Sequence, residues 1–219
     1  MRGPAAWMGA LRRRGNAPKR GVLVAAPPRD TEPPILTRFS ALVAETRPAS
    51  VLEIGTLQAI PGRPTHHQSV FPWVPRSDYV MADVQAGQDV DVVADLHGLP
   101  QEWAGRFGAF VAMAVFEHLE RPWIAAREVA RVLAPGGLFL VGTHQCFPLH
   151  GFPQDFFRFS KEALSLIFAD AGLEILEASY SERCKIVPPD SIVLPHLVDS
   201  WNANYPSYVM VSALGRKSA

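Results

Sequence analysis

The stretch Ser50–Thr56 (SVLEIGT) decides the fold of this chain. It predicts a short buried strand at residues 51–54 that carries an acidic residue at its end and is followed by a glycine. Two later strand-like runs also end in an acid, at Asp83 (YVMAD, 79–83) and at Asp95 (DVVADL, 91–96). Because parallel strands of an open α/β sheet bring their carboxyl ends to one crevice, we expect the three acids to face a common ligand site.

The three carboxylates favour a ligand that offers hydrogen-bond donors. Ribose hydroxyls and an adenine amine are such donors, since an ionised carboxylate is a strong acceptor. The positions of Glu53, Asp83 and Asp95 therefore suggest an S-adenosylmethionine site. Each has a structural alternative: Asp83 as a helix or turn cap, Asp95 in an Asx-turn, and Glu53 as a carboxylate that fixes a turn.

Strands alternate with helices outward from this stretch. Apolar periodicity predicts helices at 35–46, 122–133 and 161–171, and further strands at 79–82, 90–94, 107–113, 138–142, 173–178 and 208–213. Such alternation predicts an α/β fold with a seven-stranded, mostly parallel sheet. No helical pattern separates the last two strands, so the terminal strand is expected to be antiparallel. The predicted domain spans 34–219, with an insertion at 184–206 between the last two strands.

Composition and charge exclude several classes of protein. The 219 residues are 48% hydrophobic and 19% charged, as expected for one globular domain. Residues 1–33 form a predicted basic, Pro- and Arg-rich arm, and the remainder of the chain is acidic, which argues against a nucleic-acid groove. No run is long and apolar enough for a membrane helix, and no secretory signal is convincing. We therefore expect a cytoplasmic protein whose partner is a small-molecule acceptor, with a homodimer as an option and neither nucleic acid nor membrane as a partner.

The most specific stretch is 116–119 (FEHL) followed by 128–137 (EVARVLAPGG). Together with 51–55 (VLEIG), this order resembles the class I S-adenosylmethionine-dependent methyltransferases, from about residue 35 to the end of the chain. The resemblance implies a Rossmann-like fold and S-adenosylmethionine as the cofactor. It implies that Glu53 and Gly55 form the first cofactor motif, with Glu53 acting through loop amides or the methionine amino group. It also implies that Asp83 binds the ribose hydroxyls and that Asp95 and Leu96 lie beside the adenine.

The segment 150–160 (HGFPQDFFRFS) resembles bacterial methyltransferases found with glycan and secondary-metabolite pathways, which implies a sugar-containing or natural-product acceptor. The first motif departs from the family pattern, because Leu57 and Ala59 stand where glycines are usual. This departure keeps a second hypothesis open, a catalytically degenerate methyltransferase-like binding or scaffold protein. A nicotinamide dehydrogenase is disfavoured, since residues 55–60 (GTLQAI) lack its Gly-x-Gly-x-x-Gly pattern.

Methyl transfer to an oxygen usually needs a base, and a histidine with a near-neutral pKa suits that role. His144 directly follows the fifth predicted strand and His150 lies on the next loop, so one of them is the predicted base. Asp155 and Arg158 are predicted to hold the acceptor. The alternative is that these two residues pair and fix the loop.

Glu117 and His118 follow the fourth predicted strand, at the same crevice. We expect them to contact the cofactor or the acceptor, with helix capping by Glu117 and packing by His118 as the alternative. No metal site is predicted, because the adjacent His66 and His67 show no recognisable ligand spacing.

Overall fold

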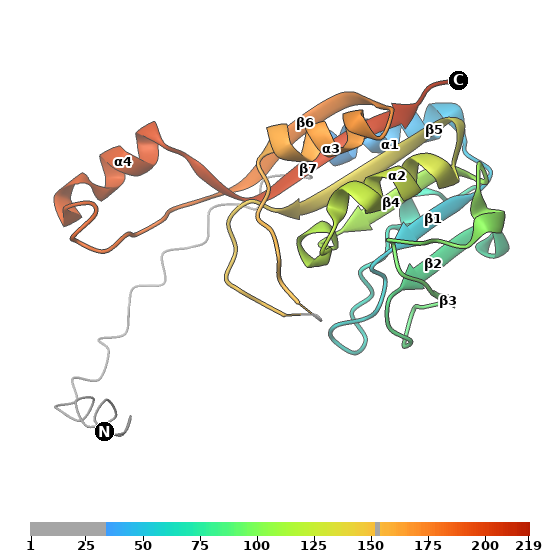
Figure 1. The fold of residues 1–219 in the computed structure, drawn as a ribbon, viewed down its shortest axis with the longest axis horizontal. Helices are drawn as coiled ribbons and strands as arrows, with labels where there is room; N and C mark the ends of the chain where they lie inside the picture. The colour runs from blue at the N-terminus through green and yellow to red at the C-terminus, as the bar shows by residue number, and fades with distance from the viewer. Residues whose placement is uncertain (1–33, 152–153) are drawn as a thin grey trace. The chain divides into compact units, whose positions relative to one another are not determined.

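Seven strands form one mixed sheet in the computed structural model, which describes residues 34–151 and 154–219 (Figure 1). The predicted arm at residues 1–33 lies outside the described residues. The strands are β1 (Val51–Ile54), β2 (Tyr79–Asp83), β3 (Val92–Val93), β4 (Phe107–Met113), β5 (Leu133–His144), β6 (Leu173–Cys184) and β7 (Ser207–Lys217). They lie in the order β3-β2-β1-β4-β5-β7-β6. The predicted seven-stranded α/β fold is confirmed.

The first five strands run parallel, and β7 runs antiparallel to both of its neighbours. The terminal strand is thus antiparallel, as predicted. It lies between β5 and β6, where it pairs with β5 from Leu138 opposite Arg216 to His144 opposite Met210. This register places the start of β7 at the carboxyl end of β5.

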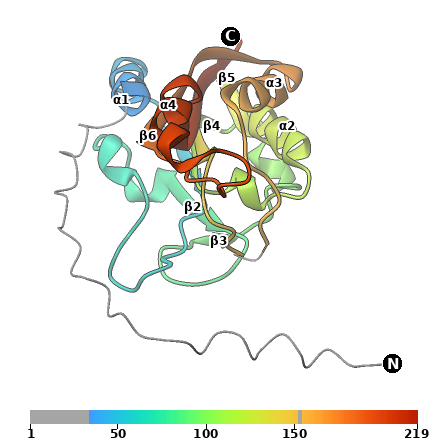
Figure 2. The ribbon, with the colours of Figure 1, turned by 90° about the vertical axis from the view of Figure 1, so that its left-hand side faces the viewer.

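Helices cover both faces of the sheet (Figure 2). Helix α1 (Pro34–Thr46) lies on one face, and α2 (Pro122–Val132) and α3 (Lys161–Asp170) lie on the other. Alternate residues of β1 enter the two cores: Val51 packs with the α1 cluster, whereas Leu52 and Ile54 pack with the α2 and α3 cluster. The burial of all four β1 residues is therefore a consequence of helices on both faces.

Element boundaries follow the predicted signals in most places. Ser160 caps α3, because its Oγ accepts a hydrogen bond from the Ala163 amide at 3.1 Å. Gly136 has a φ of +75°, which permits the sharp return after α2. The clearest difference is β3, which is shorter than predicted and in which Val93 is exposed at the edge of the sheet.

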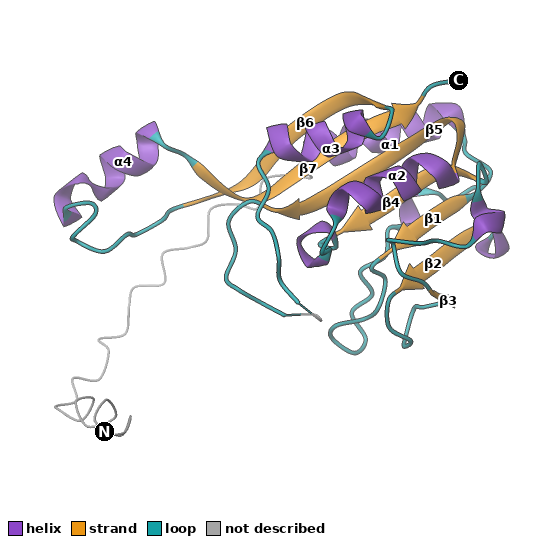
Figure 3. Cartoon of the chain, viewed as in Figure 1, coloured by secondary structure: helices purple, strands orange, loops and turns teal. Residues whose placement is uncertain are grey.

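The predicted insertion forms a lobe at residues 185–206 that projects beyond the ends of β6 and β7 (Figure 3). It contains the short helix α4 (Val198–Asn204). The buried Asn202 holds the lobe together, since its side chain bonds both backbone polar groups of Ile186 and the carbonyl of Val198. Among the described residues, none of the helices has the length and apolar character to cross a membrane.

Acid is expected to weaken the β2–β3 region through Asp91. Its carboxylate receives two hydrogen bonds from Arg76, at 2.7 and 3.1 Å, and one from the Met81 amide. The Arg76 guanidinium holds the pKa of Asp91 below its usual value. Because the pKa of Asp91 is lower in the folded than in the unfolded state, the ionised carboxylate stabilises the fold at pH values above the unfolded pKa of about 3.9. This stabilisation is lost as the pH falls from there through the folded-state pKa.

The substitution Asp91→Asn is therefore expected to lower the melting temperature by about 2 °C at pH 7, because both partners are partly exposed and the pair is worth under about 1 kcal/mol. The difference from the wild type should shrink below about pH 4. Calorimetric melts between pH 3 and 7 measure it, with Asp78→Asn as the control. A difference that stays constant down to pH 3 would contradict this role of Asp91.

Candidate active site

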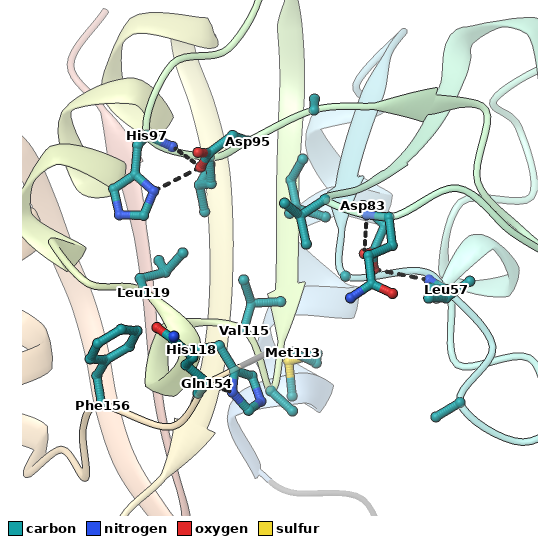
Figure 4. Close-up of a pocket in the computed structure, with 18 of the residues that line it drawn as sticks. Leu57, Asp83, Asp95, His97, Met113, Val115, His118, Leu119, Gln154 and Phe156 are labelled. Atoms are coloured by element: carbon teal, nitrogen blue, oxygen red, sulfur yellow. Dashed lines mark hydrogen bonds and ion pairs between the residues drawn. The ribbon is translucent and has the colours of Figure 1, made fainter. Parts of the chain in front are cut away.

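A cavity of about 530 Å³ lies at the carboxyl ends of β1, β2 and β4 (Figure 4). This volume is within the range of small-molecule sites. Its lining comes from five regions of the chain and includes Gly55, Leu57, Asp83, Val84, Asp95, Leu96, His97, Val115, His118, Leu119, His150, Gln154 and Phe156. The cavity thus brings together most of the predicted cofactor residues, one predicted acceptor residue (His118) and one of the two predicted bases (His150).

Asp83 ends β2 with its carboxylate at the cavity. One oxygen accepts a hydrogen bond from the Gln85 amide at 3.0 Å, and the other accepts one from the Leu57 amide at 3.2 Å. A carboxylate offers about four lone-pair sites, so each oxygen can still accept another hydrogen bond. The two amides fix the orientation of Asp83 without using up its acceptor capacity.

Gly55 connects β1 to the cavity with a φ of +86°, in the left-handed region that favours glycine. A Cβ atom at this position would lie 2.3 Å from Cγ2 of Val115. Leu57 stands two residues later, with its side chain against Gly87 and its amide bonded to Asp83. Although it replaces a family glycine, Leu57 therefore helps to orient the strand-end acid.

Asp95 and His97 are joined by hydrogen bonds at the side of the cavity where the adenine is predicted to bind. One oxygen of Asp95 accepts hydrogen bonds from the amide of His97 at 2.8 Å and from its ring Nδ1 at 2.7 Å. Burial acts to raise the pKa of Asp95, but these bonds outweigh it and the pKa lies below its usual value. The His97 Nε2 accepts from the Arg121 amide, which links this loop to the start of α2. The neighbouring Leu96 is buried.

Glu53 lies outside the cavity lining, on the α1 side of the sheet. It accepts hydrogen bonds from the His67 amide, the His67 ring and the Tyr79 hydroxyl. Burial, and then the charge of Glu53, raise the pKa of Tyr79, so the phenol stays protonated and donates. Glu53 thus acts on a loop amide and anchors the segment that follows Gly55.

Glu117 is fully buried and stands at the centre of three histidines. Its Oε2 accepts a hydrogen bond from the Thr143 hydroxyl at 2.7 Å. Its Oε1 lies 2.5 Å from Nδ1 of His144, 3.8 Å from Nε2 of His118 and 3.9 Å from Nε2 of His150. Burial raises the pKa of Glu117, but the contacts from His144 and Thr143 outweigh it and lower the pKa below its usual value.

The three histidines differ in their exposure to the cavity. His118 and His150 line it, whereas His144 is buried under the ring of Phe147, at 4.1 Å between centroids. The Nδ1 of His118 donates to the Gln154 carbonyl at 2.5 Å, which leaves Nε2 as the free ring nitrogen. Of the two predicted bases, the structure therefore places only His150 at the cavity.

Asp155 and Arg158 lie behind the lining rather than in it. The guanidinium of Arg158 binds both oxygens of Asp155, at 2.5 and 2.7 Å, and also the carbonyls of Phe147 and Pro148. The second Asp155 oxygen accepts from the His150 amide at 2.8 Å. This pair fixes the loop that carries His150, which matches the alternative considered for it.

Sequence reasoning missed His97 and Thr143. His97 had a signal, because it follows Asp95 by two residues, the spacing at which an Asx-turn forms. Thr143 had none, since its role depends on its contact with Glu117 across the fold.

Comparison with known proteins agrees with this geometry. Residues 76–141 match the methyltransferase domain family. No curated protein sequence matches the chain well enough to count as a relative.

Three solved structures share the fold at low sequence identity. The first is a chain of the Haloferax volcanii complex between a methyltransferase activator and a protein classed as a methyltransferase. It is 18% identical to this chain, the match covers 82% of this chain and 89% of that chain, and the TM-score is 0.54. A Burkholderia thailandensis 1,6-didemethyltoxoflavin-N1-methyltransferase, solved with S-adenosylhomocysteine, has 15% identity, coverage of 82% and 76%, and a TM-score of 0.53. An S-adenosylmethionine-dependent methyltransferase from Archaeoglobus fulgidus has 14% identity, coverage of 83% and 94%, and a TM-score of 0.51.

The match to the methyltransferase domain family over residues 76–141, the strand order and the strand-end acids agree with a class I, S-adenosylmethionine-dependent methyltransferase domain. S-adenosylmethionine is its cofactor, and it supplies an activated methyl group when bound. The residues present fit this cofactor. Asp83 keeps free acceptor positions at the cavity, Gly55 exposes bare backbone there, and Leu96 and Leu119 provide an apolar wall.

Proposed function

We propose that this protein transfers the methyl group of S-adenosylmethionine to an oxygen or nitrogen of a small acceptor that carries a sugar or belongs to natural-product chemistry. One observation carries the proposal: the cavity that contains Gly55, Asp83 and Asp95 also contains His118 and His150. Cofactor and acceptor groups can therefore meet in one cavity, and alignment of this kind supplies a large part of the rate enhancement.

Asp83 is proposed to bind the ribose hydroxyls, Asp95 and Leu96 to bound the adenine, and Gly55 to allow close approach of the backbone. Glu53 supports this arrangement from outside the cavity, through His67 and Tyr79.

The acceptor is proposed to lie at the edge formed by His118 and His150. His118 is proposed to take the acceptor proton, because its Nδ1 donates to the Gln154 carbonyl and Nε2 is then the ring nitrogen that can accept a proton. His150 is proposed to contact the acceptor, and Asp155 and Arg158 to position His150 through the loop. His144 supports this edge from beneath Phe147.

The acceptor class is supported by the character of the lining. Glu120 and Gln154 offer polar atoms for hydroxyl groups, while Phe156 offers an apolar surface for a ring. The Burkholderia thailandensis neighbour was solved with 1,6-didemethyltoxoflavin and S-adenosylhomocysteine bound together, which supports an acceptor beside the cofactor on this fold.

Transfer activity is tested by incubating the full chain with S-adenosylmethionine and a panel of glycosylated and aromatic metabolites, with S-adenosylhomocysteine formation as the readout. With an acceptor in hand, His118→Gln is expected to lower kcat by about 100-fold, the usual contribution of a general base, and to leave S-adenosylhomocysteine affinity within about twofold. His196→Gln, which changes an exposed histidine of the distant lobe, serves as the matched control.

Two outcomes would oppose this function. A folded wild type that does not bind S-adenosylhomocysteine favours the degenerate scaffold. Unchanged kcat in His118→Gln would remove this histidine from the chemistry.

A further inference from the structure

The geometry points to a binding site for one divalent transition-metal cation, of the zinc type, formed by Glu117, His144 and His150. Oε1 of Glu117, one ring nitrogen of His144 and one of His150 all lie within 4.8 Å of one another. The three ligands come from the segment after β4, from the end of β5 and from the following loop. The fold thus collects them from separate parts of the sequence at one edge of the cavity.

Two of the proposed ligand atoms are buried without a hydrogen-bond partner. Among the described residues, Oε1 of Glu117 and Nδ1 of His144 have no bond of acceptable geometry, although they lie 2.5 Å apart. The two atoms therefore form a close ion-pair contact but no well-directed hydrogen bond, and buried polar atoms without one are rare. A cation bound between the carboxylate and the imidazole would satisfy both atoms at once.

The distances fit a cation after small side-chain rotations. Zinc binds histidine nitrogen and carboxylate oxygen at about 2.0–2.2 Å, so two ligands of a tetrahedral site lie roughly 3.3 Å apart. Glu117 and His144 would have to open from 2.5 Å, and His150 would have to approach Glu117 from 3.9 Å. Both changes are below about 1 Å. The ligand nitrogens of His144 and His150 lie within 4.8 Å of each other and would close by at most about 1.5 Å, and His150 lies on a loop that can supply the motion.

The surroundings orient each ligand atom as a metal site requires. Thr143 holds Oε2 of Glu117 and leaves Oε1 free. Nδ1 of His150 lies 3.2 Å from the Pro148 carbonyl and 3.3 Å from a carboxylate oxygen of Asp155, so its proton has acceptors and Nε2 is left as the ligand. Metal-binding histidines usually engage their second nitrogen in this way.

The donor set selects the class of cation. Two imidazole nitrogens and one carboxylate oxygen suit zinc or another late first-row divalent ion, whereas magnesium and calcium prefer all-oxygen sites. Three protein ligands leave at least one coordination position open, and His150 places that position at the cavity. An acceptor hydroxyl bound there would lose its proton more readily. This role rests on the proposed function, but cation binding does not depend on it.

Cation binding is tested by titrating tag-free, chelator-stripped full-length protein with Zn²⁺ in a calorimeter and with Co²⁺ by visible absorption. We expect one equivalent to bind with a Kd of roughly 1 µM or tighter, and Zn²⁺ to raise the melting temperature. His150→Ala should weaken binding by about 100-fold and abolish the thermal shift. Because this side chain is partly exposed on a loop, the variant should remain folded.

Matched variants exclude other sources of affinity. His196→Ala changes an exposed histidine, and the double variant C146S/C184S removes both thiols; both should bind as the wild type does. A wild-type Kd above roughly 100 µM, or equal affinity in His150→Ala, would overturn the inference. S-adenosylhomocysteine binding, measured on the same samples, reports separately on the proposed function.

Discussion

Replacing Asp83 with alanine is expected to weaken S-adenosylhomocysteine binding by about 100-fold or more. The carboxylate keeps one free acceptor position on each oxygen, and hydrogen bonds to a charged acceptor are worth about 1.5–3 kcal/mol each. Two such bonds to ribose hydroxyls contribute at least about 3 kcal/mol, which corresponds to the stated loss. Calorimetric titration of the wild type and the variant measures it.

Two further variants separate ligand contact from loop support. Asp83→Asn keeps the shape of the side chain and one carbonyl oxygen, so it should lose affinity less than the alanine variant while retaining one of the two amide bonds. Asp78→Asn removes an exposed charge at the opposite end of β2 and should bind as the wild type does. Equal affinity in Asp83→Ala and wild type would mean that the ribose lies elsewhere.

Gly55→Ala is expected to destabilise the domain by roughly 3 kcal/mol and to impair cofactor binding. About 1–2 kcal/mol comes from placing a side chain at a φ of +86°, and the rest from the overlap with Val115. For a domain of this size, the loss corresponds to a fall in melting temperature of about 6–12 °C. Thermal melts with and without S-adenosylhomocysteine measure both effects.

Gly62 provides a matched control for this prediction. Its φ is +76°, but a Cβ atom there would meet nothing within 4 Å, so Gly62→Ala carries only the conformational cost of about 1–2 kcal/mol. Adding Val115→Ala to Gly55→Ala should recover part of the stability by removing the overlap. Equal losses at the two glycines would show that contact with Val115 is unimportant.

The fold was predictable because its signals are local. Apolar periodicity located α1, α2 and α3, and Ser160 marked the start of α3. The strands were found where the chain is apolar and bounded by turn residues. The lengths of the edge strand β3 and of β6 and β7 were harder to predict. Strand β3 is short and its Val93 is exposed, whereas β6 and β7 continue past their apolar segments because they pair with each other. Pairing partners are not visible in a single segment.

The candidate site was predictable where its polar residues lie at the ends of strands. Asp83 and Asp95 reach the cavity because parallel strands end at one edge. Glu53 also lies in a strand, but its side chain points to the opposite face, where Tyr79 and His67 take its oxygens. The position of Glu53 in the motif did not reveal which face it occupies.

The sequence by itself determined the class of fold, the order of the elements and the strand-end acids that suit S-adenosylmethionine, because each of these depends on neighbours along the chain. Tertiary structure alone decided what the histidines do. Glu117, His144 and His150 become a cluster only when the end of β5 is packed beside the segment after β4, and Phe147 then covers His144 while His150 stays at the cavity. Burial and distance between remote segments select these roles, and neither quantity is encoded in local spacing.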